Sequence, residues 1–180
     1  MPDTTPRNPI DIRSARLEDA VHVAKLGAHV FASTFGHSLP VRDLEAYLHE
    51  SYSVEAVTKD LHDADKDMVV ATSRDGTIVA FALLTRGTSE PCISQYESTV
   101  ELQRIYVQLA YHGLGIGRML AQTLEAMASA QGFKHIWLGV WEENYKAQKV
   151  YERLGYGMVG EHDFIMGEVV QTDIIMVKRL

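Results

Sequence analysis

Apolar residues in the first third of the chain recur at three- and four-residue steps, and this spacing predicts helices. The segment 18–35 carries one apolar stripe of this period, which is typical of a helix with one buried face. The stripe consists of Val23, Leu26, Val30 and Phe31. After Pro40, the segments 41–50 and 54–64 are short and mostly polar, and they are also expected to be helical.

Alternating and continuous apolar runs predict the first strands of a sheet. Residues 10–13 alternate between apolar and polar side chains, as in a half-buried strand. Asp75-Gly76 separates the apolar runs 67–73 and 78–85, and this arrangement is a strong hairpin signal. These three segments are therefore expected to lie in one sheet.

The segment 99–107 is predicted to be the next strand, with one irregularity. Its inward residues are Leu102, Ile105 and Val107. Side chains of a regular strand return to the same face every two residues, so the three-residue step from Leu102 to Ile105 does not fit. A β-bulge near Gln103 and Arg104 would account for it.

The second half of the chain alternates between helix and strand. A helix is predicted over 114–131, with Gly132 at its end, and a buried strand over 135–141. A shorter helix follows, capped by Asn144. Its apolar stripe consists of Ala147, Val150, Tyr151 and Leu154.

Two further strands, 156–165 and 172–178, are expected to close the sheet, with Gly167 in the turn between them. The order of the segments predicts one mixed α/β sheet with helices packed against it. Residues 1–9 are expected to form a flexible tail, and residues 10–180 a single domain.

Composition narrows the class of protein. The 180 residues include 17 basic and 24 acidic side chains, a formal net charge of −7, which argues against a nucleic-acid binder. No apolar stretch is long enough for a membrane span. The single cysteine, Cys92, excludes a disulfide framework and indicates a reducing compartment, so we expect a cytoplasmic protein. The eight histidines show no ligand spacing, and no metal is expected.

A glycine-rich turn follows the bulged strand. Gly113, Gly115 and Gly117 precede a predicted helix, and the free amides of a helix start suit a phosphate. A dinucleotide fingerprint would require a third glycine where Arg118 stands, and a Walker A loop is absent. These residues alone leave open whether the turn binds a ligand or is only structural.

The turn, read as His112-Gly113-Leu114-Gly115-Ile116-Gly117, resembles the acetyl-CoA-binding motif of the GCN5-related N-acetyltransferase (GNAT) superfamily. The family pattern is [RQ]-x-x-G-x-[GA], from which His112 departs. A second family motif is similar to residues 140–147, followed by Tyr151, Gly155 and Tyr156. The resemblance covers nearly the whole chain.

A narrower resemblance is to the PaiA-type spermidine/spermine N-acetyltransferases. It rests on residues 101–106 and 136–142 and on the tail, Phe164-x-Met166-Gly167 with Gln171-Thr172-Asp173. The resemblance implies the GNAT fold, an α/β fold. Its mixed, mostly antiparallel sheet has six to seven strands, with a bulged, splayed pair of strands and about four helices.

The resemblance also implies a reaction: transfer of an acetyl group from acetyl-CoA, a co-substrate, to a primary amine by direct attack in a ternary complex. A polyamine such as spermidine or spermine is the expected acceptor. Two kinds of alternative stay open. The enzyme could acetylate another small amine, such as an antibiotic or an amino-acid-like compound, or a protein N-terminus. The chain could instead be a non-catalytic acyl-CoA-binding regulator. A homodimer is also left open.

Residue roles carry over by position in the two motifs. Tyr151 is implied to be the general acid that protonates the thiolate. Glu101 is implied to be the base, with a water chain as the alternative. The implied cofactor-binding residues are Ile105, Tyr106, Val107, His112, Gly113, Leu114, Gly115, Ile116, Gly117, Arg118, Asn144, Lys146, Ala147 and Tyr151. The implied substrate-binding residues are Phe31, Phe35, Glu45 and Glu101.

The negative charge is concentrated in one segment. Residues 41–67 hold three basic and eight acidic side chains, so 3 − 8 = −5 of the total −7 lies there. In the resembled fold this segment walls the acceptor side. It is therefore either an ordinary solvated surface or a region that attracts a cationic acceptor.

Overall fold

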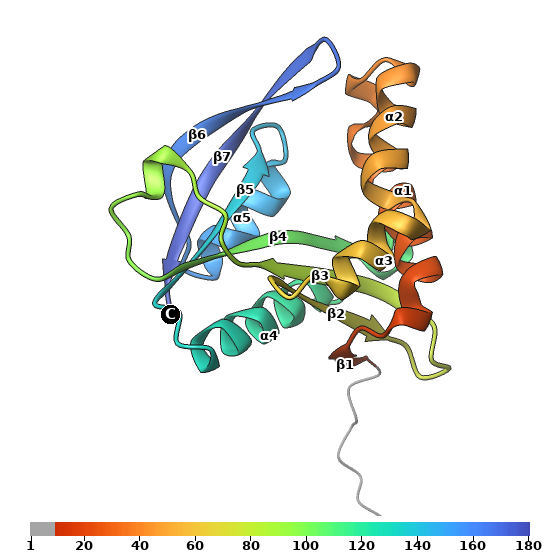
Figure 1. Cartoon of the computed structure of the whole chain (residues 1–180), viewed down its shortest axis with the longest axis horizontal. Coiled ribbons are helices and arrows are strands. Elements are labelled where there is room, and N and C mark those ends of the chain that lie inside the picture. Colours follow the sequence, from red (N-terminus) through yellow and green to blue (C-terminus); the bar gives the residue numbers. More distant parts are fainter. Residues whose placement is uncertain (1–9) are drawn as a thin grey trace, which may run out of the picture.

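The computed structural model describes residues 10–180 and is built around one seven-stranded sheet (Figure 1). The strand order is β1-β2-β3-β4-β5-β7-β6. The strands are β1 (Asp11–Ser14), β2 (Lys66–Thr72), β3 (Ile78–Thr85), β4 (Thr99–Val107), β5 (His135–Trp141), β6 (Gly157–Met166) and β7 (Val169–Arg179). Among the strands of the described residues, only β4 and β5 pair in parallel, which confirms the mixed, mostly antiparallel sheet. The predicted tail over residues 1–9 lies outside the described residues.

Within residues 10–180, five α-helices cover the two faces of this sheet, one more than the approximate number that the resemblance implies. They are α1 (Ala20–Phe35), α2 (Val41–Tyr52), α3 (Val54–His62), α4 (Ile116–Ala130) and α5 (Tyr145–Arg153). Helices α1, α2 and α3 pack on one face, and α4 and α5 pack on the other (Figure 1). We call these the α1 face and the α4 face.

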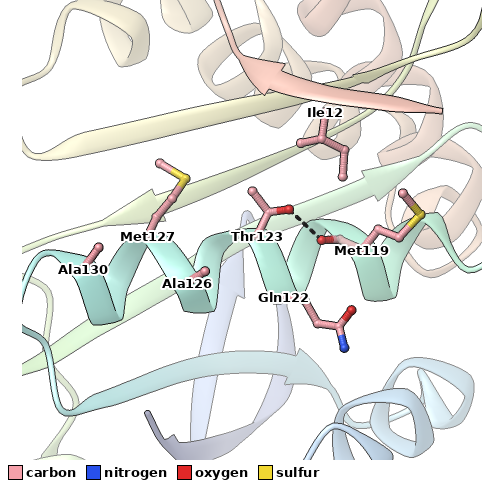
Figure 2. Close-up of a pocket in the computed structure, with 7 residues that line it drawn as sticks. All are labelled: Ile12, Met119, Gln122, Thr123, Ala126, Met127 and Ala130. Atoms are coloured by element: carbon pink, nitrogen blue, oxygen red, sulfur yellow. Dashed lines mark hydrogen bonds between the residues drawn. The ribbon is translucent and has the colours of Figure 1, made fainter. Parts of the chain in front are cut away.

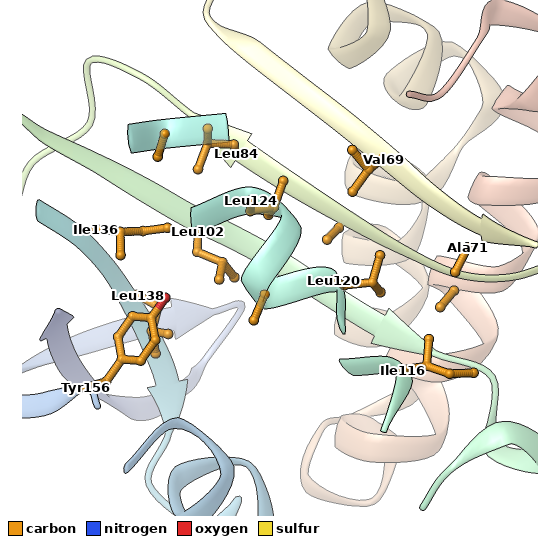
Figure 3. Packing of buried hydrophobic residues seen from close by; sticks show 14 of the residues in the cluster. Val69, Ala71, Leu84, Leu102, Ile116, Leu120, Leu124, Ile136, Leu138 and Tyr156 are labelled. Atoms are coloured by element: carbon orange, nitrogen blue, oxygen red, sulfur yellow. The ribbon is translucent and has the colours of Figure 1, made fainter. Parts of the chain in front are cut away.

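The α4 face buries the larger core. Ile116, Leu120 and Leu124 of α4 fit against alternate residues of the strands, including Leu102 and Leu138 (Figure 3). The sequence folds this way because the apolar residues of α4 fall three or four positions apart and so share one side of the helix.

The α1 face holds a second core, so the central strands are buried on both sides. In β2, Val69 packs on the α4 face while its neighbours Met68 and Val70 pack beneath α1. The central strands therefore appear in the sequence as continuous apolar runs rather than as an apolar–polar alternation.

One helix boundary and one buried position expected from the sequence are wrong. The predicted helix 114–131 begins only at Ile116, because Gly115 has a φ of 77°, a left-handed conformation that ends the helix on that side. Val150 was expected on the buried stripe of α5, yet its exposed fraction is 41%. Val150 directly precedes Tyr151, so it is turned by about 100° away from the sheet.

The β6–β7 hairpin is longer than predicted and reaches the N-terminal helices. Strand β7 begins at Val169 instead of residue 172, and the tight turn includes Gly167 with a φ of 59°. The Asp43 carboxylate of α2 lies against Gly167. Gln171 Nε2 donates a hydrogen bond to Ser38 Oγ at 2.7 Å. The hairpin thus contacts the segment that connects α1 and α2.

The core of the α4 face offers a stability prediction. Leu124 has an exposed fraction of 0%, so Leu124→Ala removes buried methyl groups and leaves a cavity. The free energy of unfolding, measured by urea denaturation, should fall by about 2–5 kcal/mol. Leu114→Ala is the matched control, because Leu114 is 64% exposed and its loss should change stability little. Equal effects of the two substitutions would contradict this description of the core.

Candidate active site

The bulge in β4 separates β4 from β5. Leu83 pairs with Arg104 but the next residue, Leu84, pairs with Leu102, so Gln103 is the extra residue, as predicted. Strands β4 and β5 pair only over Thr99–Glu101 and His135–Trp137. Beyond these residues, no register connects the two strands, although both continue. The predicted splayed pair of strands is therefore confirmed.

The edge of β4 that faces β5 carries backbone groups that point into the space between the two strands. The amide of Gln108 donates to the Val79 carbonyl at 2.8 Å. In an antiparallel ladder, successive residues alternate between bonding the partner strand and facing away. The N–H and C=O groups of Ile105 and Val107 must therefore point toward β5, whereas those of Tyr106 bond β3. The backbone of Tyr106, expected to bind the cofactor, is thus already used within the sheet.

The glycine-rich turn lies directly after this edge. Gly113 and Gly115 have φ values of 80° and 77°, and a Cβ at either position would meet no atom within 4 Å. Glycine is therefore required for the backbone conformation, and the space over the turn is open. The first amides of α4 have no acceptors within the helix, so the turn fits a pyrophosphate.

His112, the residue that departs from the family pattern, has a structural partner. Its Nε2 lies 2.8 Å from the Val107 carbonyl oxygen. The imidazole ring thus ties the turn to the end of β4. This contact leaves the amide of Val107 and both backbone groups of Ile105 facing β5.

Helix α5 places a tyrosine beside the separated strands. Asn144 Oδ1 accepts a hydrogen bond from the Ala147 amide at 3.2 Å, so Asn144 caps the helix as predicted. Tyr151, two turns into α5, packs against the α4-face core, and its ring centroid is 5.7 Å from that of Tyr156. Burial raises the pKa of Tyr151 to about 12, so its hydroxyl stays protonated at neutral pH. Lys146 is exposed.

Partly buried carboxylates gather on the α1 face near the point where pairing ends. Burial raises the pKa of Glu101, which lies at the last paired position of β4. Glu90 Oε2 lies 3.0 Å from His162 Nδ1, and the Glu90 charge raises the pKa of both Glu101 and Asp173. Burial raises the pKa of Asp173 to about 6. An ideal Cβ at Gly139 would lie 3.1 Å from Asp173 Oδ2, so this carboxylate leans over β5.

Basic side chains balance only part of this charge. Arg104 Nη1 lies 3.1 Å from Asp60 Oδ2, and Lys66 Nζ lies 2.5 Å from Asp60 Oδ1. Burial is the main influence on the pKa of Glu101, and the charges of both cations act against it by lowering this pKa. Among the described residues, this part of the α1 face therefore holds four carboxylates but only two permanent cations to balance them. The carboxylates are those of Asp60, Glu90, Glu101 and Asp173.

The predicted substrate-binding residues do not form a single wall. Phe31 is 3% exposed, and its ring is buried against that of Tyr47 at 4.5 Å. Phe35 is half-buried and reaches Trp141 of β5, with ring centroids 5.1 Å apart. Glu45 is exposed on α2. The structure therefore brings Phe35 and Glu101 onto the α1 face, while Phe31 lies beneath other aromatic rings.

Sequence reasoning missed several residues of the site. Asp173 belonged to the quoted tail motif, and its polar side chain beside an apolar strand was the available signal. Glu90 and His162 gave no signal, because a loop and a hairpin far apart in the sequence bring them together. Tyr52 was not singled out, although its hydroxyl donates to that of Tyr106 at 2.8 Å.

A separate shallow groove of about 650 Å³ lies between α4 and β1, and Figure 2 shows its lining. The lining residues are Ile12, Met119, Gln122, Thr123, Ala126, Met127 and Ala130. None of these side chains is charged, so the groove offers no cation for a CoA phosphate. It lies at the β1 edge of the sheet, away from β5.

Two further observations apply to residues 10–180. No three His, Cys, Asp or Glu side chains come together as a group that could hold a metal ion. None of the helices has the length and apolar character needed to span a bilayer.

The sequence model of the acetyltransferase (GNAT) family matches residues 33–156, and the chain belongs to this family. An uncharacterized N-acetyltransferase of Mycobacterium tuberculosis is 27% identical over 164 residues, which cover 91% of this chain and 99% of that protein. A spermine/spermidine N(1)-acetyltransferase of Bacillus subtilis is 33% identical over 82 residues, 45% of this chain and 50% of that protein.

The crystal structure of PaiA N-acetyltransferase from Thermoplasma acidophilum in complex with coenzyme A matches the fold with a TM-score of 0.75. The match covers 95% of this chain and 99% of that chain at 22% sequence identity. The predicted GNAT fold is thus confirmed. The chain is an acetyl-CoA-dependent N-acetyltransferase of the GNAT family.

The buried carboxylate of Asp173 leads to a prediction about pH. Its folded pKa of about 6 lies above the ordinary value of 3.8, so the folded state binds the proton more tightly. The resulting penalty is absent below pH 3.8, where both states are protonated, and complete above about pH 6. Asp173→Asn removes it and should raise the free energy of unfolding above pH 6 by on the order of 1–2 kcal/mol.

Urea denaturation at several pH values from 3.5 to 8 would measure this difference, which should vanish at the acid end. Asp163→Asn is the matched control on the same hairpin, because Asp163 is exposed and has little desolvation to relieve. A difference for Asp173→Asn that is constant with pH would contradict the assignment.

Proposed function

We propose that the protein transfers the acetyl group of acetyl-CoA to a primary amine of a small cation, a polyamine such as spermidine or spermine. The amine attacks the thioester directly in a ternary complex. The observation that supports this proposal is the separation of β4 from β5. Beside it lie a backbone edge without strand partners, a glycine-rich turn suited to a phosphate, and a tyrosine that stays protonated.

Each part of acetyl-CoA has residues suited to it. The amides from Gly113 to Arg118 at the start of α4 would hold the pyrophosphate. The backbone groups of Ile105 and Val107 that face β5 would hold the amide groups of the pantetheine arm. Lys146 and Ala147 stand at the start of α5 on the other side of the separation. His112 keeps the turn in register through its contact with Val107.

The chemical step needs a proton acceptor and a proton donor. An alkyl ammonium has a pKa near ~10, so it must lose a proton before it attacks. Glu101 would accept that proton, since its carboxylate lies where the strands begin to separate and burial raises its pKa. The Tyr151 hydroxyl would protonate the sulfur of the departing thiolate.

The unbalanced charge of the α1 face favours a cationic acceptor. Two carboxylates of the four, Glu101 and Asp173, have no salt bridge within the described residues. A bound ammonium group would compensate part of the desolvation that raises their pKa values. The exposed Glu45 and Glu50 of α2 would add a longer-range attraction.

A coupled assay of CoA release tests the proposed acceptor. With acetyl-CoA, spermidine and spermine should give faster release than antibiotic amines, amino-acid-like amines or a peptide N-terminus. Because the attraction is electrostatic, the KM for a polyamine should rise with ionic strength, and charge reversal at Glu45 and Glu50 should raise it in the same way.

If CoA is released with other amines but with neither polyamine, a polyamine is excluded as the acceptor, while the acetyltransferase activity itself is retained. Tight acetyl-CoA binding without release from any amine would instead favour a non-catalytic regulator.

Tyr151→Phe tests the general acid. The substitution removes only the hydroxyl, so kcat should fall by roughly 10²- to 10⁴-fold, the usual range for general acid catalysis. The fold and acetyl-CoA affinity should be unchanged, as measured by thermal unfolding and calorimetry. Tyr145→Phe is the matched control, because Tyr145 belongs to the same helix but is 66% exposed. Wild-type turnover in Tyr151→Phe would end this assignment.

A further inference from the structure

Two tyrosine hydroxyls meet on the α1 face, in a contact that the proposed reaction has not used. Tyr52, at the end of α2, donates a hydrogen bond to the hydroxyl of Tyr106 of β4 at 2.8 Å. Tyr52 is 4% exposed, whereas Tyr106 is only half-buried. The two residues are 54 positions apart in the sequence, so only the fold pairs them.

The ring of Tyr52 is held from two sides. A Cβ at Gly27 of α1 would lie 2.5 Å from Tyr52 Cδ1, so the ring occupies the space that this glycine leaves. The Arg104 guanidinium carbon lies 5.0 Å from the ring centroid, at the distance of a cation–π contact. Asp60 in turn holds the guanidinium at 3.1 Å. The Tyr52 hydroxyl therefore has a fixed position.

The direction of the hydrogen bond follows from burial. Desolvation raises the pKa of Tyr106 to about 12 and that of Tyr52 well above 10, so both hydroxyls keep their protons at neutral pH. If Tyr106 were the donor, the Tyr52 hydrogen would be buried without an acceptor, which is unfavourable. With Tyr52 as the donor, the hydrogen of Tyr106 is left for another acceptor.

Tyr106 is placed where such a donor would be useful. It stands between Ile105 and Val107, whose backbone groups face the separation of β4 and β5. Its side chain lies on the α1 face, whereas Tyr151 packs on the α4 face. Burial raises the pKa of Tyr151, and the charge of Tyr106 is the second cause of this shift.

We propose that Tyr106 is a further catalytic residue, whose hydroxyl donates a hydrogen bond to the acetyl oxygen as negative charge develops there, and that Tyr52 is its positioning residue. The inference rests on the proposed acetyl transfer. In that step Glu101 takes the ammonium proton, nitrogen then bonds to the carbonyl carbon, and the carbon–sulfur bond breaks as Tyr151 protonates sulfur. The second proton, which nitrogen loses on becoming an amide, restores the Tyr151 hydroxyl. Tyr106 keeps its own proton and acts only as a donor.

Tyrosine-to-phenylalanine substitutions test this arrangement with the best amine found for the wild type. Tyr106→Phe should lower kcat by roughly ten- to a hundredfold, since it removes one donor to the developing charge. Tyr52→Phe should lower kcat by roughly three- to tenfold, because Tyr106 loses its orienting partner. KM for the amine and affinity for acetyl-CoA should not change. The double variant should be no slower than Tyr106→Phe alone, because both act through one hydroxyl.

Tyr47→Phe is the matched control, because Tyr47 belongs to the same aromatic cluster as Tyr52. The Tyr47→Phe variant should retain the wild-type kcat. Thermal unfolding of each variant checks that the fold is retained. If Tyr106→Phe is unstable, the kcat of Tyr52→Phe still tests the arrangement. Equal kcat in Tyr106→Phe and Tyr47→Phe, or a raised KM at unchanged kcat, would overturn the catalytic role. Additive losses in the double variant would overturn the role of Tyr52. An inactive wild type would instead remove the proposed function, and this inference with it.

Discussion

The loss of pairing between β4 and β5 after Glu101 is the constraint on which the rest of the site depends. One extra residue, Gln103, turns β4 away from its neighbour. Backbone groups that would have bonded β5 then need other partners, because buried peptide groups are costly when unpaired. Acetyl-CoA can supply those partners, so an irregularity of the sheet becomes a binding edge.

Strand β4 also directs its side chains to the two different faces of the sheet. Residues of β4 alternate between the faces, so Ile105 joins the core beside α4 while Tyr106 and Glu101 face α1. Tyr151, the proposed donor to sulfur, and the groups proposed to meet the amine therefore lie on opposite faces of the sheet. A sheet that separates locally allows access from both faces without any large rearrangement of its two cores.

The proposed acceptor site contains partly buried carboxylates, which reduce the stability of the fold. Burial desolvates Glu101 and Asp173, and their charges are only partly balanced. Natural proteins accept such local destabilisation mainly at functional sites. On the same face of the sheet, α2 and the hairpin meet at Asp43 and Gly167.

The sequence by itself determined the elements, the bulge, the glycine turn and the capped helix, because each is specified by residues close together along the chain. The three-residue step in β4 located Gln103, and the start of α4 was missed only by two residues. The tertiary structure alone decided which distant side chains meet. The contacts of Tyr52 with Tyr106 and of Glu90 with His162 depend on how whole elements pack. Local periodicity reports burial but not partners, so the acceptor side could not be assembled from sequence.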